Sequence, residues 1–299
     1  MSVRSDGEVQ PEQPGGRSIR LLTGNLLSGG VGRSRGESRF EPLMKIAAAQ
    51  DADLACFQEC LYFAAGGHRL FHRAEAILGM RGLLGMAPSG QHVAVFVRAP
   101  LLVAGSRMLP TAVWHHGAFK AEIAYPRAGA EPGVLTVASV HLSPSSPAQR
   151  LGEAEQLVEY VESDGFAVIA GDTNTADHDT DLSGATPRMR AAKSLVGSAT
   201  PDVRPIARLT DAGFFDAAAL TGKRQSTTGH WAGHGLSARP DRILLSPTAA
   251  AGLERVSVVP EVAEYSDHLW LTADLLVPRL VLPDRRGAMR SETAAAGRR

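Results

Sequence analysis

Short apolar runs of β-strand type recur along almost the whole chain, and this feature constrains the fold more than any other. Each run is rich in aliphatic side chains. The expected strands are Ile19–Leu22, Leu54–Gln58, Val93–Val97, Ala121–Ala124, Val134–Val140, Ala167–Ala170, Arg242–Leu245, Val256–Val259 and Leu269–Leu275. Helical spacing of apolar residues is rarer and marks Phe40–Gln50, Arg69–Leu78 and Pro147–Glu162.

The clearest helical segment is Pro147–Glu162, where apolar side chains recur at helical spacing between Glu and Gln residues. Ser146 precedes it as an N-cap, and proline at the first helical position costs no hydrogen bond. Strands still outnumber helices, and the last third of the chain is nearly all strand and loop. The sequence therefore favours an α/β (α+β) fold of packed β-sheets with helices outside over a doubly wound parallel sheet.

The organisation along the chain predicts one domain over residues 19–280. We expect disordered tails at residues 1–18 and 281–299, because both segments are polar and lack an apolar pattern. No repeat or linker-like stretch divides the chain. The one long irregular stretch, about residues 175–205, is expected to be its most variable part.

Composition excludes some classes of function. The 31 basic and 31 acidic residues balance, so the chain has no net attraction for DNA or an acidic membrane, although a local basic strip is compatible with that sum. No stretch approaches the roughly 20 apolar residues of a membrane span, and the N-terminus lacks the apolar segment of a secretory signal. Cys56 and Cys60 are too far apart to bridge easily in an extended segment, so we expect a reduced cytoplasmic protein.

Polar side chains with catalytic potential stand at the edges of the apolar runs, where a β-rich scaffold fixes side chains and loops admit a substrate. These residues are Asn25, Glu59, His141, Asp172, Asn174, Asp241, Asp267 and His268. Hydrolysis of a phosphate ester needs oxygen ligands for a divalent cation, a base for water and a donor for the leaving oxygen. Carboxylate, amide and imidazole groups can supply each of these parts.

Each position, taken alone, has a plainer explanation that is commoner in proteins. Asn25 near a glycine suits a turn, Glu59 suits a solvated strand end, and His141 suits an edge or core histidine. Residues 171–174, Gly-Asp-Thr-Asn, also suit a turn, and residues 266–268, Ser-Asp-His, suit the start of a helix or turn. Only the ordered set favours a shared site.

The order of these motifs resembles the endonuclease/exonuclease/phosphatase superfamily, which includes DNase I, exonuclease III-type nucleases, neutral sphingomyelinases and inositol polyphosphate 5-phosphatases. From about Ile19 to Val277 the motifs run as Asn, Gln-Glu, strand-His, Gly-Asp-x-Asn, Asp-x-Ile-Leu and Ser-Asp-His. The segments Val-Arg-Ala-Pro and Leu-Thr-Asp-Ala-Gly-Phe-Phe-Asp agree with the resemblance. It implies a four-layered, DNase I-like sandwich of two packed, mostly antiparallel sheets flanked by helices.

The resemblance also implies how a cation and the attacking water would be held. Glu59, with Asn25 beside it, would hold Mg²⁺ or Mn²⁺, and Asp267 would be a further ligand. Asp172 and Asn174 would position the water and the scissile phosphate, with Asp172 also approaching the metal. Asn174 would thus be a substrate-binding residue.

Imidazole groups would complete the implied site. His268, held in one tautomer by Asp241, would be a base or a donor to the phosphate. His141 would contact the phosphate or the leaving oxygen as an electrostatic stabiliser or acid. The predicted function is therefore divalent-metal-dependent hydrolysis of phosphate esters, with a nuclease-type phosphodiesterase ranked first.

Two alternatives stay open. The expected substrate is a phosphate ester, either a nucleic acid or a small molecule. In the first alternative the protein is a phosphatase or phosphodiesterase that acts on a small metabolite or a lipid. The protein could instead be a fold relative repurposed for ligand binding or non-phosphate chemistry, but the presence of Glu59, Asp172 and His268 argues against a degraded site. No obligate protein partner is evident, and the metal count and oligomeric state stay undetermined.

Several positions depart from the family pattern or lie outside it. His92 stands where many relatives have glycine, and Arg242 would put a positive charge near a sheet face or the rim of the site. Two histidine pairs, His115–His116 and His230–His234, lie in loops that could line the cleft, each with a tryptophan beside it. An acidic and histidine-containing patch is expected to be a solvated loop more than a second metal site. Its members are Asp177, His178, Asp179 and Asp181.

Overall fold

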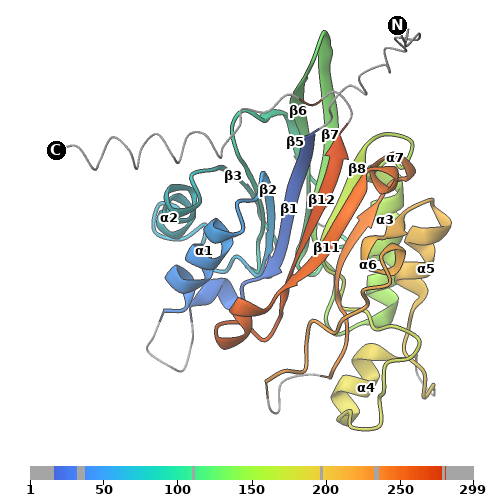
Figure 1. Cartoon of the computed structure of the whole chain (residues 1–299). Helices are drawn as coiled ribbons and strands as arrows, with labels where there is room; N and C mark the ends of the chain where they lie inside the picture. Colours follow the sequence, from blue (N-terminus) through green and yellow to red (C-terminus); the bar gives the residue numbers. More distant parts are fainter. Residues whose placement is uncertain are drawn as a thin grey trace, which may run out of the picture.

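Two six-stranded β-sheets pack against each other in the computed structural model, and helices flank them on both sides (Figure 1). The structure describes residues 17–31, 38–109, 112–195, 198–231, 236–277 and 280. The predicted tails lie outside this part of the chain, except that Arg17 and Ser18 pair with Val277 and Leu276. The first strand thus begins at Arg17, two residues before the start expected for the domain.

The first sheet runs in the order β11-β12-β1-β2-β4-β3, and the second in the order β5-β6-β7-β8-β10-β9. The strands are β1 (Arg17–Asn25), β2 (Leu54–Gln58), β3 (Arg81–Gly85), β4 (Val93–Val97), β5 (Leu102–Met108), β6 (Gly117–Arg127), β7 (Ala130–His141), β8 (Ala167–Asp172), β9 (Phe215–Asp216), β10 (Asp241–Leu245), β11 (Leu253–Val259) and β12 (Trp270–Val277). The helices are η1 (Ser28–Gly30), α1 (Phe40–Ala49), α2 (Arg69–Leu78), α3 (Pro147–Tyr160), α4 (Pro187–Lys193), α5 (Arg204–Asp211), α6 (Ala217–Leu220), α7 (Pro247–Ala251) and η2 (Pro260–Glu264). Within the described residues, no helix combines the length and apolar character needed to cross a membrane.

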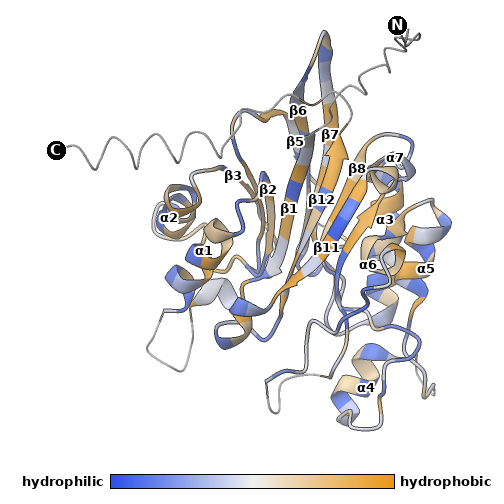
Figure 2. Ribbon diagram, viewed as in Figure 1, coloured by the Kyte–Doolittle hydropathy of each residue, from blue (hydrophilic) through white to orange (hydrophobic). Residues whose placement is uncertain are grey.

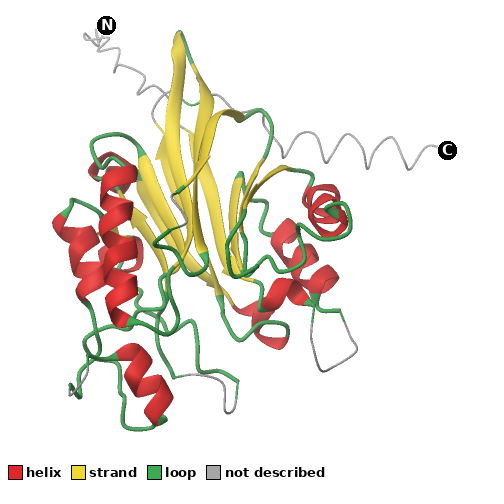
Figure 3. Ribbon diagram, turned by 180° about the vertical axis from the view of Figure 1, so that it is seen from behind, coloured by secondary structure: helices red, strands yellow, loops and turns green. Residues whose placement is uncertain are grey.

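Apolar side chains fill the space between the sheets and the space under the helices on each side. Figure 2 shows hydrophobic residues along the strands and the covering helices, and Figure 3 shows from behind that helices lie on both sides of the strands. α1 and α2 cover the first sheet, and α3 and α5 cover the second. The central strands β2, β4, β8 and β10 are buried at every position, because both of their faces are covered. The predicted four-layered sandwich is confirmed.

Every predicted strand and helix is present, but weaker elements were missed. β3, β5 and β9 are edge strands that bury almost none of their side chains fully, so their sequences contain no strong apolar run. The stretch predicted to be irregular at about 175–205 contains α4, which no apolar period announces because the helix buries none of its residues. The side chain of Thr186 caps it by accepting a hydrogen bond from the Met189 N–H (3.2 Å).

Two strand pairs run parallel, β1 with β2 and β7 with β8, whereas the other pairs within the described sheets are antiparallel. Parallel strands end at the same edge of a sheet, so Asn25 lies opposite Gln58 and His141 lies opposite Asp172. β10 is antiparallel to β8 and starts at this edge, with Asp241 opposite Asp172. The topology therefore gathers strand ends from both sheets at one end of the sandwich.

Gly171 permits the close packing of β8 at this end. Its φ is +149°, and a Cβ atom there would lie 2.0 Å from the carbonyl oxygen of Val140 on β7. The next residue is Asp172, so the backbone position of its carboxylate depends on the absence of a Cβ atom at Gly171.

We expect Gly171→Ala to lower the free energy of unfolding by at least ~2 kcal/mol, because the backbone must move to relieve the contact. Urea unfolding of the variant measures this loss. Gly165→Ala is the matched control, since nothing lies within 4 Å of a Cβ atom there, and it should stay within ~0.5 kcal/mol of the wild type. Equal unfolding midpoints for Gly171→Ala and the wild type would show that the backbone accommodates the methyl group.

Candidate active site

The amide group of Asn25 connects two carboxylates at the end of the sandwich described above. Its Nδ2 donates hydrogen bonds to Glu59 Oε1 (3.1 Å) and to Asp172 Oδ2 (3.1 Å). Its Oδ1 accepts a hydrogen bond from the Leu27 N–H (2.9 Å), which fixes which way the amide faces. Glu59 follows a strand of the first sheet and Asp172 ends a strand of the second, so one buried side chain joins both sheets.

Glu59 is held by its backbone as well as by Asn25. Its φ is +55°, a left-handed conformation that turns the chain sharply after β2. Its second oxygen, Oε2, accepts a hydrogen bond from the Ser28 N–H (2.7 Å). Among the described residues, no lysine, arginine or histidine forms an ion pair with Glu59, so its charge faces neutral donors alone.

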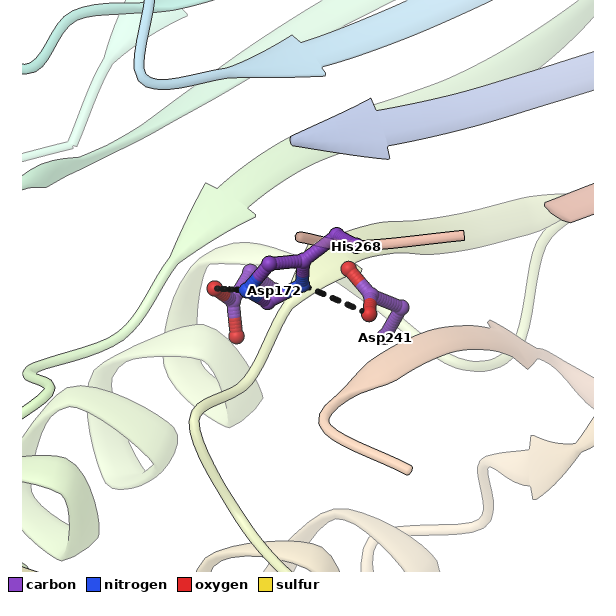
Figure 4. A group of neighbouring side chains, drawn as sticks. All are labelled: Asp172, Asp241 and His268. Atoms are coloured by element: carbon purple, nitrogen blue, oxygen red, sulfur yellow. Dashed lines mark hydrogen bonds and ion pairs between the residues drawn. The ribbon is translucent and has the colours of Figure 1, made fainter. Parts of the chain in front are cut away.

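The imidazole of His268 lies between two aspartates (Figure 4). Its Nδ1 is 2.9 Å from Asp241 Oδ2, and its Nε2 is 3.8 Å from Asp172 Oδ2. Thr227 Oγ1 donates to the same Asp241 oxygen (2.5 Å). Burial opposes the charged form, but the negative charges of Asp241 and Asp172 raise the pKa of His268 to about 10.

Asp172 stays ionised although it is buried. Burial by itself would raise its pKa, but the charges of His268 and His141 and a hydrogen bond from His141 hold the pKa well below the ordinary value. His141 Nε2 lies 3.4 Å from Asp172 Oδ2. The same carboxylate oxygen therefore faces two imidazoles and the amide of Asn25.

Ligand atoms of Asp172, Asp241 and His268 lie within 4.8 Å of one another and form a possible acidic and histidine-containing metal site. A protonated imidazole has no lone pair to offer a cation. Because its pKa is raised, His268 is a hydrogen-bond donor and not a metal ligand. Of this group, only the carboxylates of Asp172 and Asp241 then offer hard oxygen ligands. Asp267 lies outside this group and lines a cavity beside His268.

A second histidine, His116, packs against the ring of His141 although the two residues are far apart in the sequence. The rings of His116 and His141 stack with centroids 4.2 Å apart and an interplanar angle of 23°. Ser89 Oγ is 2.9 Å from His116 Nδ1. Burial lowers the pKa of His116 to about 2, so this ring is neutral where it covers His141.

The side chain of Asn174 is held from two sides. Its Nδ2 donates to the carbonyl oxygen of Leu142 (3.0 Å), and its Oδ1 accepts from Lys193 Nζ (3.2 Å). Its backbone N–H donates to Asp172 Oδ1 (2.8 Å), and its φ is +50°. One amide hydrogen is left for a substrate atom.

Helix α3 supports the loops that carry these groups. Glu153 is fully buried and accepts hydrogen bonds from the N–H groups of Ser143 (2.6 Å) and His115 (3.0 Å). Arg150, also fully buried, donates to the carbonyl oxygens of Ser143 (2.8 Å) and Ala192. Because the loops at His115 and Ser143 are both bound to one helix, His116 and His141 keep their positions relative to each other.

The predicted solvated patch was wrong for Asp177. Half-buried Asp177 and buried Asp216 form a network of ion pairs with the buried Arg239 and Arg242. The shortest contact is 2.6 Å, between Arg242 Nη1 and Asp216 Oδ2. Arg242 therefore lies inside the protein and not on an open face, because two carboxylates neutralise it. The other members of the patch are exposed, as predicted; they are His178, Asp179 and Asp181.

The remaining loop residues have structural contacts. Trp114 is buried and donates to Gln156 (2.8 Å), and Trp231 donates to the carbonyl of Ala263 (2.5 Å). His230 lies 2.9 Å from the carbonyl of Ser266, one step from the site, while His234 lies outside the described residues. The two cysteines are buried and unbridged; they are Cys56 and Cys60.

The sequence marked His92 as a departure from the family pattern, but it gave no sign that Lys193 contacts the site. His92 Nδ1 accepts a hydrogen bond from the Ala87 N–H (3.0 Å), and its carbonyl accepts from Cys60, beside Glu59. Lys193, Thr227 and Glu153 carry no motif, and their contacts to the site appear only in three dimensions.

A family model identifies the family of the chain, and solved structures share its fold. The model of the Endonuclease/Exonuclease/phosphatase family matches residues 22–268. The catalytic domain of Xenopus laevis APE2 is 16% identical with a TM-score of 0.65, covering 89% of this chain and 94% of that one. No curated protein sequence matches the chain.

Two further solved structures share the fold. An endonuclease/exonuclease/phosphatase from Beutenbergia cavernae is 17% identical with a TM-score of 0.64, covering 91% of this chain and 76% of that one. The 3′ phosphatase NExo from Neisseria, bound to product DNA hairpin, is 19% identical with a TM-score of 0.62. The alignment covers 86% of this chain and 99% of that one. At these identities the likeness concerns the fold alone.

The pKa of His268 predicts a pH-dependent contribution to stability. The folded value, about 10, exceeds the ordinary value of 6.5, so the charged ring stabilises the fold fully below pH ~6.5 and not at all above pH ~10. In EDTA, the difference in unfolding free energy between the wild type and His268→Gln should therefore shrink as pH rises through that window. Urea unfolding across the range measures it. A difference that does not change with pH would mean that the ring is not charged between its aspartates.

Proposed function

The chain belongs to the endonuclease/exonuclease/phosphatase family, and from this premise we propose that it is a divalent-metal-dependent hydrolase of phosphate esters. One observation carries the proposal: Asn25 draws Glu59 and Asp172 together beside the charged imidazole of His268. Anionic oxygens for a cation and a cationic donor for a phosphate thus lie side by side, as charge-stabilised phosphoryl transfer requires.

The donor set fits Mg²⁺ or Mn²⁺. Glu59 and Asp172 offer hard carboxylate oxygens, and the group that lies between them is the neutral amide of Asn25. We assign these two carboxylates as ligands, Asn25 as the residue that positions them, and Asp267 as a candidate further ligand. When bound, the cation would neutralise charge on the phosphoryl oxygens.

The side chains around the cation would divide the remaining work. Asp172, ionised and backed by His141, would orient the attacking water. His268, kept charged by Asp241, would donate a hydrogen bond to a phosphate oxygen. The free amide hydrogen of Asn174 would bind a second phosphate oxygen.

The leading substrate class is a nucleic acid, which makes the protein a nuclease-type phosphodiesterase. The fold relative from Neisseria, bound to a product DNA hairpin, supports this class. A small phosphorylated metabolite is the second candidate, and the small cavity beside His268 favours it. Balanced charge, 31 basic against 31 acidic residues, gives no added preference for long nucleic acids.

We expect hydrolysis of bis-p-nitrophenyl phosphate with Mg²⁺ or Mn²⁺ and loss of that activity in EDTA, because the carboxylates need a cation to bind a phosphate. A substrate panel of plasmid DNA, RNA, sphingomyelin and phosphorylated metabolites then ranks the substrate classes. Activity that survives EDTA, or no turnover of any ester with either metal, would favour a repurposed fold.

Substitutions should separate metal binding from catalysis. Glu59→Gln should raise the metal concentration for half-maximal activity about tenfold or more, because it removes an anionic ligand. His268→Ala should lower kcat on the order of 10²- to 10⁴-fold with little change in that concentration. Glu155→Gln and His178→Ala, both at exposed positions, are the matched controls. Full activity in His268→Ala would show that the site is assigned wrongly.

A further inference from the structure

A cavity of about 170 Å³ adjoins the catalytic groups on the side of α4. It shares His268 and Asn174 with the candidate active site, so a group bound there is next to a phosphate bound at these residues. Five of the other eight lining side chains are apolar, Lys193 is a cation, Asp267 is a carboxylate and Thr228 carries a hydroxyl group. These lining residues are Ala176, Met189, Lys193, Thr228, Leu236, Ala238, Pro240 and Asp267.

Helix α4 presents two of these residues on one face. Met189 and Lys193 are four residues apart, so they lie one helical turn from each other. The end of the helix is fixed, because buried Arg150 donates to the carbonyl of Ala192 and the Asp202 N–H donates to the carbonyl of Lys193 (2.7 Å). The ammonium group is thus carried by a backbone that two other segments hold in place.

The charge of Lys193 has no carboxylate in contact with it. Lys193 Nζ donates to the carbonyl oxygen of Asn174 (2.8 Å) and to its Oδ1 (3.2 Å), and among the described residues it forms no ion pair. An ammonium group has three hydrogens, so one is available to a ligand in the cavity. A cation that is partly buried against neutral acceptors is a binding group for an anion.

We propose that this cavity is a subsite for a second anionic group of the substrate, a phosphate or carboxylate joined to the scissile phosphate by a short apolar linker. The inference rests on the proposed phosphoesterase function and favours its second substrate class, a small molecule, over the first, a nucleic acid. Lys193 would bind the second anion, while Met189 and Leu236 would contact the linker. The scissile phosphate would remain at His268 and Asn174.

The size of the cavity favours a small molecule over a polynucleotide. Pockets that enclose drug-sized ligands hold about 300–1,000 Å³, so a cavity of about 170 Å³ suits a linker of a few carbon atoms and one anionic group. A neighbouring phosphate of a nucleic acid offers the same anionic chemistry on a bulkier nucleoside. The experiment must therefore distinguish these two sources.

Calorimetric titration in Mg²⁺ with propane-1,3-diphosphonate and propylphosphonate isolates the second anion, since the two probes differ in that group alone. The wild type should bind the diphosphonate about tenfold more tightly, the value of one charge-assisted hydrogen bond. Lys193→Gln, which keeps a donor for Asn174 but loses the charge, should reduce the preference to within about twofold and leave propylphosphonate unaffected. Lys45→Met, at an exposed ion pair on α1, is the control and should keep the full preference.

Three results would overturn the proposal. They are a wild type without preference, a Lys193→Gln variant that keeps it, and equal weakening of both probes, which would make Lys193 only a support for Asn174. A 5′-phosphorylated trithymidylate should lose no affinity in Lys193→Gln, and a loss equal to that of the diphosphonate would overturn the small-substrate assignment. Neither phosphonate is hydrolysed, so the preference is measurable even if no ester is turned over and the proposed function fails.

Discussion

The side-chain amide of Asn25 is the interaction on which the arrangement at this end of the sandwich depends. Its Nδ2 binds a carboxylate from each sheet, and its backbone carbonyl accepts hydrogen bonds from Ser266 Oγ and Trp270 Nε1 (3.0 Å each). One buried residue thus links the end of β1 to β2, β8 and the start of β12. Two like charges lie close together there because a neutral donor lies between them.

Buried charged side chains near the site fix the positions of its loops relative to one another. Arg239 and Arg242 lie on either side of Asp241, and both bind Asp177 and Asp216. Burial would raise the pKa of Asp216, but the two arginines hold it below its ordinary value. Buried ion pairs contribute little net stability relative to apolar packing. Their effect here is geometric, because they connect the loop after β8 to the start of β10, where the aspartate partner of His268 lies.

Helix α3 gives the second support, and it explains how an irregular stretch can still carry an ordered group. Arg150 and Glu153 lie on its inner face without exposed surface, and their hydrogen bonds go to the backbone of loops and of α4. Through the carbonyl of Ala192 the helix reaches α4, which buries none of its own residues. The position of Lys193 therefore depends on contacts made by another helix, not on apolar packing of its own.

The sequence alone determined the strands with buried faces, because a short aliphatic run such as Val93–Val97 is stable only as a buried strand. It also determined the order of motifs that indicated the family. It also located Asn25, Glu59, Asp172 and His268 as candidates, since each stands where an apolar run stops. It could not reveal strands such as β5, which has no fully buried residue and therefore no strong apolar run. Only the tertiary structure decided that parallel strand pairs bring these residues together and that Lys193 faces a cavity. The physical reason is that hydrogen bonds between residues far apart in the chain leave no local pattern, whereas burial of a whole strand does.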